Sequence, residues 1–276
     1  MFTTNLAAFR RHFSENPLVI TNHGFRVKRN ASLDLAQDIY FSSLGRWTLR
    51  SADYVVSLTE SERRKTVSAG VPSERTVVIP NGVDTHVFRP RAFEPIPRSI
   101  CWTGRYVAEK GLTYLLEAAK IVTADFPDAK FLLTGYGEER SRLLQLRHQL
   151  SLEDNVILTS PKSQEEIVTL LNKCTLFALP SLSEGFPAAV LEAMSCGRPV
   201  VVTAGIGLEE VVGDAGLYAQ AGNPHELANA ITTILAHENY GTSLGRRGRE
   251  RVTQYYDWGN VVSAVNDLYR KAIEEK

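Results

Sequence analysis

The chain has 276 residues, 43% hydrophobic and 22% charged, which predicts a soluble globular protein with one large domain or two of ordinary size. The 31 Lys and Arg residues balance the 31 Asp and Glu residues, so no basic field favours nucleic-acid binding and any phosphate site must be local. No uncharged stretch reaches the ~20 apolar residues of a membrane-spanning helix, and the first residues do not resemble a signal peptide. Three cysteines without a C-x-x-C pair predict reduced, buried thiols in a cytoplasmic protein.

The first 95 residues contain few strand signals. Three aliphatic runs predict strands at 18–21, 54–58 and 76–79, and helices are expected around 33–50 and at 61–69. Residues 89–98 hold three of the twelve prolines, which predicts an interdomain linker. We therefore expect residues 1–95 to form a shortened Rossmann-like domain whose exposed sheet edge invites completion by a dimer or another subunit.

Six short β-branched or aliphatic runs follow, separated by segments of helical period. They predict strands at 99–103, 130–134, 155–159, 175–179, 199–203 and 216–219. This alternation is typical of a parallel sheet covered on both faces by helices. We therefore expect an α/β fold with a second, complete Rossmann-like domain over 96–255 and a last helix over 256–276 that packs back toward the first domain.

Several helices carry recognisable ends or faces. Ser163 and Glu166 are spaced as a capping box, Pro187 suits the first turn of a helix, and Gly197 suits the end of that helix. A helix over 112–126 is expected to bury Leu112, Leu115, Leu116, Ala119 and Val122. In the last two helices, 241–256 and 257–273, an apolar stripe predicted to lie in the core comprises Tyr255, Trp258, Val262, Val265, Leu268 and Tyr269.

The strongest chemical signal is a pair of glutamates around a predicted strand-to-helix turn. Glu184 and Glu192 are eight residues apart, and Gly185 and Pro187 lie between them at the turn. A helix N-terminus presents amide groups and partial positive charge to an anion, while Glu192 could accept hydrogen bonds from hydroxyl groups of the same ligand. Each acid taken alone would instead be interpreted as a solvated surface residue.

Two cations belong to another loop at the same predicted sheet edge. Arg105 and Lys110 follow the strand at 99–103, and ligands of open α/β sheets bind at the carboxyl ends of the strands. Arg105 through paired hydrogen bonds and Lys110 as a point charge could neutralise a diphosphate. The alternative is that both pair with Glu109 and the helix surface.

From about residue 51 to 273 the chain resembles the retaining glycosyltransferases of family 4, which adopt the GT-B fold of two facing Rossmann-like domains. The resemblance rests on PNGVD at 80–84, GRYVAEKG at 104–111, LLTGYGEE at 132–139, ALPSLSEGFPAAVLEAMSCGRPVVV at 178–202 and YDW at 256–258. It implies transfer of a sugar from a UDP-, GDP- or ADP-sugar to a glycan, lipid or small-molecule acceptor, with retention of configuration.

The resemblance also implies roles for individual residues. Arg105 and Lys110 would bind the donor diphosphate, Glu184 would lie near the transferred sugar, and Glu192 would bond the ribose. Further donor contacts would come from Gly185, Phe186 and Pro187. Gly137 is interpreted first as part of a tight turn, with a donor-facing backbone as the alternative.

His23, after the strand at 18–21, is the candidate to face the transferred sugar, with a structural or surface histidine as the alternative. The cluster Arg26, Lys28 and Arg29 is expected to be a solvated loop, with a peripheral contact to the inner membrane face as the alternative.

The absent motifs narrow the chemistry. The sequence has no Asp-x-Asp, so we expect no metal and no cofactor besides the donor substrate, and it has no G-x-G-x-x-G or Walker A motif to support nicotinamide or nucleoside triphosphate chemistry. Two competing functions remain open. One is a nucleotide-sugar-binding subunit that needs a partner to complete its amino-terminal domain, and the other is a sugar-nucleotide epimerase of the same fold.

Overall fold

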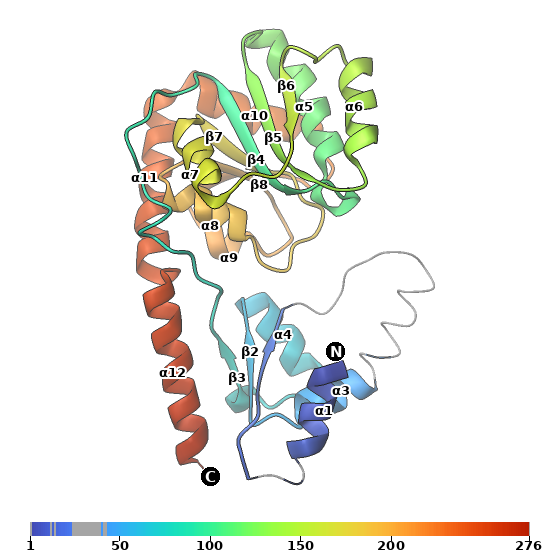
Figure 1. Ribbon diagram of the computed structural model, residues 1–276, viewed down its shortest axis with the longest axis vertical. Helices are drawn as coiled ribbons and strands as arrows, with labels where there is room; N and C mark the ends of the chain where they lie inside the picture. The colour runs from blue at the N-terminus through green and yellow to red at the C-terminus, as the bar shows by residue number, and fades with distance from the viewer. Residues whose placement is uncertain (1, 12, 14, 24–39, 41–42, 276) are drawn as a thin grey trace. The chain divides into compact units, whose positions relative to one another are not determined.

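The computed structural model describes residues 2–11, 13, 15–23, 40 and 43–275. The chain divides into two compact units: Met1–Asn81 together with Trp258–Lys276, and Gly82–Asp257. Each unit holds its own parallel sheet, and helices flank these sheets (Figure 1). The predicted α/β class with two parallel sheets is confirmed.

The first unit has a sheet of three strands in the order β1-β2-β3. Its strands are β1 (Val19–Asn22), β2 (Tyr54–Ser57) and β3 (Thr76–Val78), and its helices are α1 (Phe2–Arg11), α3 (Leu44–Arg50), α4 (Glu60–Ser68), the 3₁₀ helix Ser73–Arg75 and α12 (Trp258–Glu274). Every residue of the central strand β2 is buried, as expected for a strand paired on both edges and covered on both faces. All three strands predicted in this part of the chain are present.

Helix α12 packs on the sheet of the first unit, but the face that it buries differs from the predicted stripe. Its buried residues are Val261, Leu268 and Ala272, which form a core cluster with Tyr54, Val56 and Ile79. Of the predicted stripe, Tyr255, Trp258, Val262 and Tyr269 are exposed, Leu268 is buried and Val265 is partly buried. The prediction was wrong because the apolar face of this helix is wider than the part that the sheet covers. The part with Val261, Leu268 and Ala272 is buried, and the adjoining part is exposed.

The second unit has six parallel strands in the order β6-β5-β4-β7-β8-β9. The strands are β4 (Ser99–Arg105), β5 (Lys130–Tyr136), β6 (Val156–Thr159), β7 (Leu176–Leu179), β8 (Val200–Thr203) and β9 (Gly216–Ala219). The helices are the 3₁₀ helix Ala108–Lys110, α5 (Leu112–Asp125), α6 (Arg140–Gln149), α7 (Gln164–Lys173), α8 (Ala188–Ser195), α9 (Glu209–Val212), α10 (Pro224–Ala236) and α11 (Glu238–Tyr255). All six predicted strands are present.

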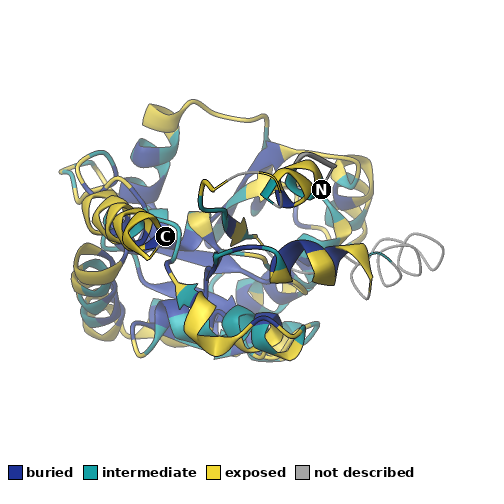
Figure 2. Ribbon diagram, turned by 90° about the horizontal axis from the view of Figure 1, so that it is seen from below, coloured by how far each residue is buried: buried dark blue, intermediate teal, exposed yellow. Residues whose placement is uncertain are grey.

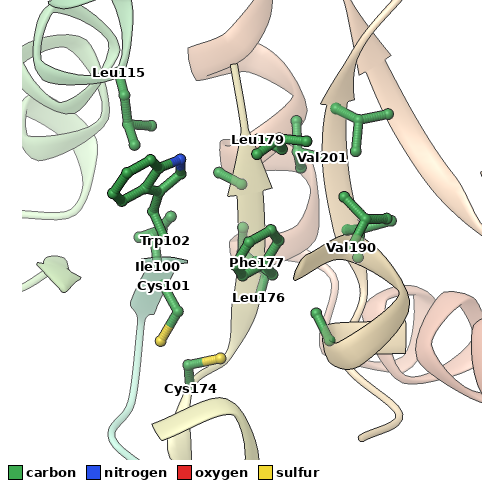
Figure 3. Close-up of a cluster of buried hydrophobic side chains, with 14 of the residues drawn as sticks. Ile100, Cys101, Trp102, Leu115, Cys174, Leu176, Phe177, Leu179, Val190 and Val201 are labelled. Carbon is green, nitrogen blue, oxygen red and sulfur yellow. The ribbon is translucent and has the colours of Figure 1, made fainter. Parts of the chain in front are cut away.

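The core of the second unit lies between its central strands and the helices beside them. Trp102 of β4 points toward Leu115 of α5, and Phe177 and Leu179 of β7 lie beside Val201 of β8 (Figure 3). The central strands are mostly buried, whereas the outward sides of the helices are exposed (Figure 2). The predicted face of α5 is confirmed, with all five of its expected residues buried.

The predicted helix ends are largely confirmed. Ser163 and Glu166 form the full capping box at the start of α7. Gly197, with a φ of +71°, ends α8, and the amide of Arg198 donates to the carbonyl of Ala193 as in a Schellman turn. Pro187 lies one residue earlier than predicted, at the N-cap of α8, where its carbonyl accepts the first hydrogen bonds of the helix.

The proline-rich segment 89–98 belongs to the second unit and does not link the two units. The amide of Arg91 donates to Asn172 Oδ1 at 2.7 Å, and the amide of Ile96 donates to the carbonyl of Lys173 at 2.8 Å. These two amides attach the segment to the end of α7. The division between the units falls after Asn81 rather than near residue 95.

Cys101, Cys174 and Cys196 are free and buried, as predicted. Burial raises the pKa of the Cys101 thiol well above its ordinary value, and the neighbouring Cys174 (Figure 3) acts in the same direction. None of the helices among the described residues is both long and apolar enough to cross a membrane.

Candidate functional site

The strand order of the second unit creates a topological switch point between β4 and β7. Strands β4, β5 and β6 run outward to one side, and β7, β8 and β9 run outward to the other. At such a point the connections leave the sheet in opposite directions, which opens a crevice beyond the carboxyl ends of the two central strands. The loops that follow β4 and β7 are the two segments in which the sequence placed the candidate residues.

The loop after β4 is anchored by Tyr106. Its side chain is fully buried, its hydroxyl donates toward the carbonyls of Leu133 at 2.7 Å and Thr159 at 2.9 Å, and its ring stacks on Trp102 at 5.5 Å. Burial raises the pKa of Tyr106 to about 12, so it stays a neutral donor at physiological pH. This anchoring role of Tyr106 was not predicted, although an aromatic residue between Arg105 and Lys110 is a signal for one.

Gly137, after β5, supports the same loop from behind. It has a φ of +149°, and a Cβ atom there would lie 2.2 Å from the carbonyl oxygen of Tyr106. The amide of Glu139 also donates to this oxygen, at 3.0 Å. Only glycine allows this close approach, which agrees with the interpretation of Gly137 as part of a tight turn.

The loops after β4 and β7 are joined by an ion pair. Lys110 Nζ lies 2.6 Å from Glu184 Oε1, and the two side chains are 22% and 8% exposed. The hydroxyl of the buried Ser181 donates to the same oxygen at 2.6 Å. The structure therefore brings together two predicted site residues that are 74 positions apart, and it adds Ser181, which the sequence analysis did not single out.

Backbone contacts hold these two loops at a fixed distance. The amide of Leu182 donates to the carbonyl of Glu109 at 2.8 Å. Gly111 has a φ of +63°, and a Cβ atom there would lie 2.1 Å from the carbonyl oxygen of Pro180. The alternative that Lys110 pairs with Glu109 is not what the structure shows, because its partner is Glu184.

Glu192 lies in α8 as a half-buried acid. Among the described residues no side chain or amide donates to its carboxylate, and burial raises its pKa from 4.5 to about 7. The interpretation of Glu192 as an ordinary surface acid is therefore wrong. A half-buried carboxylate without a protein donor can accept hydrogen bonds from a ligand's hydroxyl groups.

The turn into α8 leaves amide groups available. Within the described part of the chain the amides of Gly185 and Phe186 donate to no protein acceptor, and Gly185 is exposed. The Phe186 ring packs at 6.4 Å from that of Tyr256, which fixes the turn against the core. Free amides at a helix N-terminus suit an anion.

Two further candidates lie apart from the ion pair. Arg105, at the end of β4, is exposed, and its guanidinium has no hydrogen bond or ion pair with any described residue. His23 follows β1 and is exposed, but it belongs to the first unit, so its role stays a prediction. Arg26, Lys28 and Arg29 lie outside the described residues.

The described residues contain no cluster of three or more His, Cys, Asp or Glu side chains that could hold a metal ion.

Two of the motifs that carry the resemblance meet within the second unit. The amide of Val83, in PNGVD, donates to the carbonyl of Tyr256 at 2.8 Å, and Thr85 Oγ1 donates to Asp257 Oδ2 at 2.5 Å. PNGVD and the Thr85 that follows it therefore bond directly to YDW, although about 170 residues separate them along the chain.

Comparison with protein families decides which family the chain belongs to. The model described as "Glycosyl transferases group 1" matches residues 88–251, more than half of the chain, and that of "Glycosyltransferase Family 4" matches residues 1–87. The chain belongs to the group 1 glycosyl transferases. The family 4 resemblance predicted from the motifs is thereby confirmed.

Named relatives and solved structures agree with this membership. The chain is 32% identical to the MMP alpha-(1->4)-mannosyltransferase of Mycolicibacterium hassiacum over 74% of this chain and 50% of that protein. The chain spans about half of the length of the first curated relatives that it matches.

Among solved structures, a sucrose-phosphate synthase from Thermosynechococcus elongatus superimposes with a TM-score of 0.82 at 25% identity, covering 99% of this chain and 72% of that one. Anabaena HepE in complex with UDP-glucose superimposes with a TM-score of 0.82 at 22% identity, covering 99% and 76%. The GT-B fold class is confirmed.

Proposed function

We propose that the chain transfers a sugar from a nucleoside-diphosphate sugar to an acceptor, with retention of configuration and without a metal ion. The observation that carries the proposal is the set of charged groups at the switch point of a group 1 glycosyl transferase: Arg105, Lys110, Glu184 and Glu192. HepE, which shares the fold, was solved with UDP-glucose, which supports a UDP-sugar as the first donor to try.

The two cations would supply the main rate enhancement. As the bond between sugar and diphosphate breaks, negative charge grows on the leaving diphosphate, and positive charge grows on the sugar. Lys110 and the amides of Gly185 and Phe186 would offer donors that lie in place before the reaction, and the exposed Arg105 would add its charge once the diphosphate binds. Groups placed in advance stabilise developing charge without the cost of reorganising solvent.

The acids would serve the sugar parts of the donor. Glu192 would accept hydrogen bonds from the ribose hydroxyls, because its carboxylate has no donor among the described residues. Glu184, on the same loop as the free amides, would lie near the transferred sugar. His23 is proposed to contact that sugar from the first unit, and Gly137 contributes by holding Tyr106 in place.

Substitution of the two cations tests the proposal. Arg105→Ala and Lys110→Ala should each lower kcat by ~10²–10³, the usual cost of removing one group that stabilises transition-state charge. Arg105→Ala should change thermal stability little, whereas Lys110→Ala should also lower it, because it leaves the carboxylate of Glu184 without its cation. His23→Ala should lower kcat and leave the Kd of the nucleoside diphosphate unchanged. The matched control is Lys120→Ala, which removes an exposed lysine of α5 and should leave kcat unaltered. An unchanged kcat in both Arg105→Ala and Lys110→Ala would contradict the proposal.

The finer parts of the proposal need separate measurements. A thermal-shift panel of UDP-, GDP- and ADP-sugars identifies the donor, because a bound ligand stabilises the folded state. Proton NMR of the product reports the anomeric configuration, and an assay in EDTA tests the need for a metal. Donor binding without transfer or hydrolysis would favour a binding subunit, and a changed donor sugar formed without acceptor would favour an epimerase.

A further inference from the structure

The ion pair between Lys110 and Glu184 competes with the proposed binding of the donor diphosphate by Lys110. At 2.6 Å its ammonium is neutralised by a carboxylate whose side chain is only 8% exposed. A diphosphate that needs this ammonium meets a second anion already bound to it. Lys110 therefore cannot give its full charge to a diphosphate until Glu184 releases it.

The pair is held by its surroundings and is not a chance surface contact. Ser181, fully buried, donates to the same oxygen of Glu184, so the carboxylate is held from two sides. The loops that carry Lys110 and Glu184 are joined by the bond from Leu182 to Glu109 and by the close approach of Gly111 to Pro180. This short, partly buried geometry is the kind in which an ion pair contributes, unlike the exposed pair of Arg246 and Glu250.

We propose that Glu184 is a built-in competitor for Lys110, which the donor diphosphate must displace, and that it thereby sets the preference for the intact sugar nucleotide over the nucleoside diphosphate product. This inference rests on the proposed function. A nucleoside diphosphate alone frees Glu184 from Lys110 and gives it no new partner. An intact donor brings sugar hydroxyls that can donate to the released carboxylate.

Because Glu184 exchanges Lys110 for the sugar hydroxyls, the site favours binding of the donor over binding of the product. With the sugar attached, the loss of the ion pair is offset by hydrogen bonds from the sugar to Glu184. Once the sugar has left, Glu184 regains Lys110 and weakens the hold on the diphosphate. Glu184 is then a specificity-determining residue as well as a neighbour of the sugar, because it penalises the product more than the substrate.

The test measures the Kd of UDP and of UDP-glucose by calorimetry for the full chain, followed by the GDP and ADP counterparts if UDP does not bind. Glu184→Gln keeps the size of the side chain and removes its charge, so it should lower the Kd of the nucleoside diphosphate about tenfold, as expected for one charge-assisted contact. The Kd of the nucleotide sugar should fall less, so the ratio of the two Kd values should shrink. In a Lys110→Met background the effect of Glu184→Gln should vanish.

The matched control is Glu109→Gln, which removes one negative charge from the same loop without freeing Lys110 and should leave both Kd values unchanged. Ser181→Ala keeps the charge of Glu184 but removes the hydroxyl that still donates to it once Lys110 is released, so displacement should cost more and the Kd of the nucleoside diphosphate should rise. It provides a second test if Glu184→Gln does not fold.

The outcomes separate this inference from the proposed function. Binding of a nucleoside diphosphate with the same Kd in wild type and Glu184→Gln would overturn the inference alone. Tightening that persists in the Lys110→Met background would also overturn it, because simple repulsion would then be the cause. No binding of UDP, GDP, ADP or their sugars by any variant would overturn both.

Discussion

At the scale of single residues, Glu192 is the clearest case of a group that weakens the fold. Its pKa is raised from 4.5 to about 7 because burial disfavours the carboxylate, and no described residue donates to it. Between these two values the folded state holds a proton that the unfolded state has released. The free energy of unfolding therefore falls as the pH rises from about 4.5 to 7, and above pH 7 the full penalty remains.

Glu192→Gln should remove this penalty. We expect the variant to be about 1–3 kcal/mol more stable than wild type at pH 8 and equally stable at pH 4.5, as measured by urea unfolding. Glu94→Gln, a change at an exposed acid of the same unit, is the control and should give no such difference. The same Glu192→Gln variant should bind the nucleotide more weakly, since its neutral amide would lack the charge that ribose hydroxyls favour. Equal stability of both proteins at pH 8 would show that the carboxylate has a compensating partner.

At the scale of elements, the loops at the carboxyl ends of β4 and β5 are structurally coupled. Tyr106 joins them through its amide, its carbonyl and its hydroxyl, and Gly137 makes room for its carbonyl. Substitutions that separate these loops should therefore disturb Arg105 and Lys110 without touching either side chain.

Gly137→Ala tests this coupling. The new methyl group would start 2.2 Å from the carbonyl oxygen of Tyr106 at a φ of +149°, so we expect a loss of about 2–4 kcal/mol in the free energy of unfolding and a weaker Kd for the nucleoside diphosphate. Gly205→Ala is the matched control, because it has a φ of +80° with no atom within 4 Å and should cost only the backbone strain of about 1–2 kcal/mol. The coupling is refuted if the two substitutions cost the same.

The elements also show how far the sequence determines the structure. Strands and capped helices follow from local patterns, as at Ser163 and Glu166, and α10 could have been found from Asn223, Pro224 and Glu226, which cap its start. The buried face of α12 could not, because its apolar side is wider than its contact with the sheet and the sheet decides which apolar residues are covered. Local pattern identifies the element, whereas tertiary contacts choose its face.

In the candidate site, too, local pattern identifies the residues and tertiary contacts decide their partners. Its residues were recognisable from motifs, and the position of the loops after β4 and β7 at one sheet edge follows from the alternation of strands and helices. The pairing of Lys110 with Glu184 depends on β4 lying beside β7, which is a property of strand order and not of either motif. Tyr106 acquires its role through contacts with the neighbouring strands, whereas Ser181 bonds to Glu184 three residues later in its own loop.

At the scale of the whole molecule, the two units have separate cores, and the proposed donor-binding residues all lie in the second unit. His23 is the one proposed site residue in the first unit. A nucleoside diphosphate, which lacks the sugar that His23 is proposed to contact, should therefore need only the second unit.

Hydrogen exchange on the full chain with a saturating nucleoside diphosphate tests whether the second unit alone binds this ligand. At a concentration of about 100 times its Kd, the ligand adds ~2.7 kcal/mol to the stability of whatever unit binds it, so exchange from that unit's most protected amides should slow by up to about 100-fold. We expect the slowing in β4, β7 and β8 and none in β1, β2 and β3. Lys110→Met, at the same ligand concentration, should lose most of it. An equal gain of protection in the strands of both units would show that the first unit takes part in binding the diphosphate.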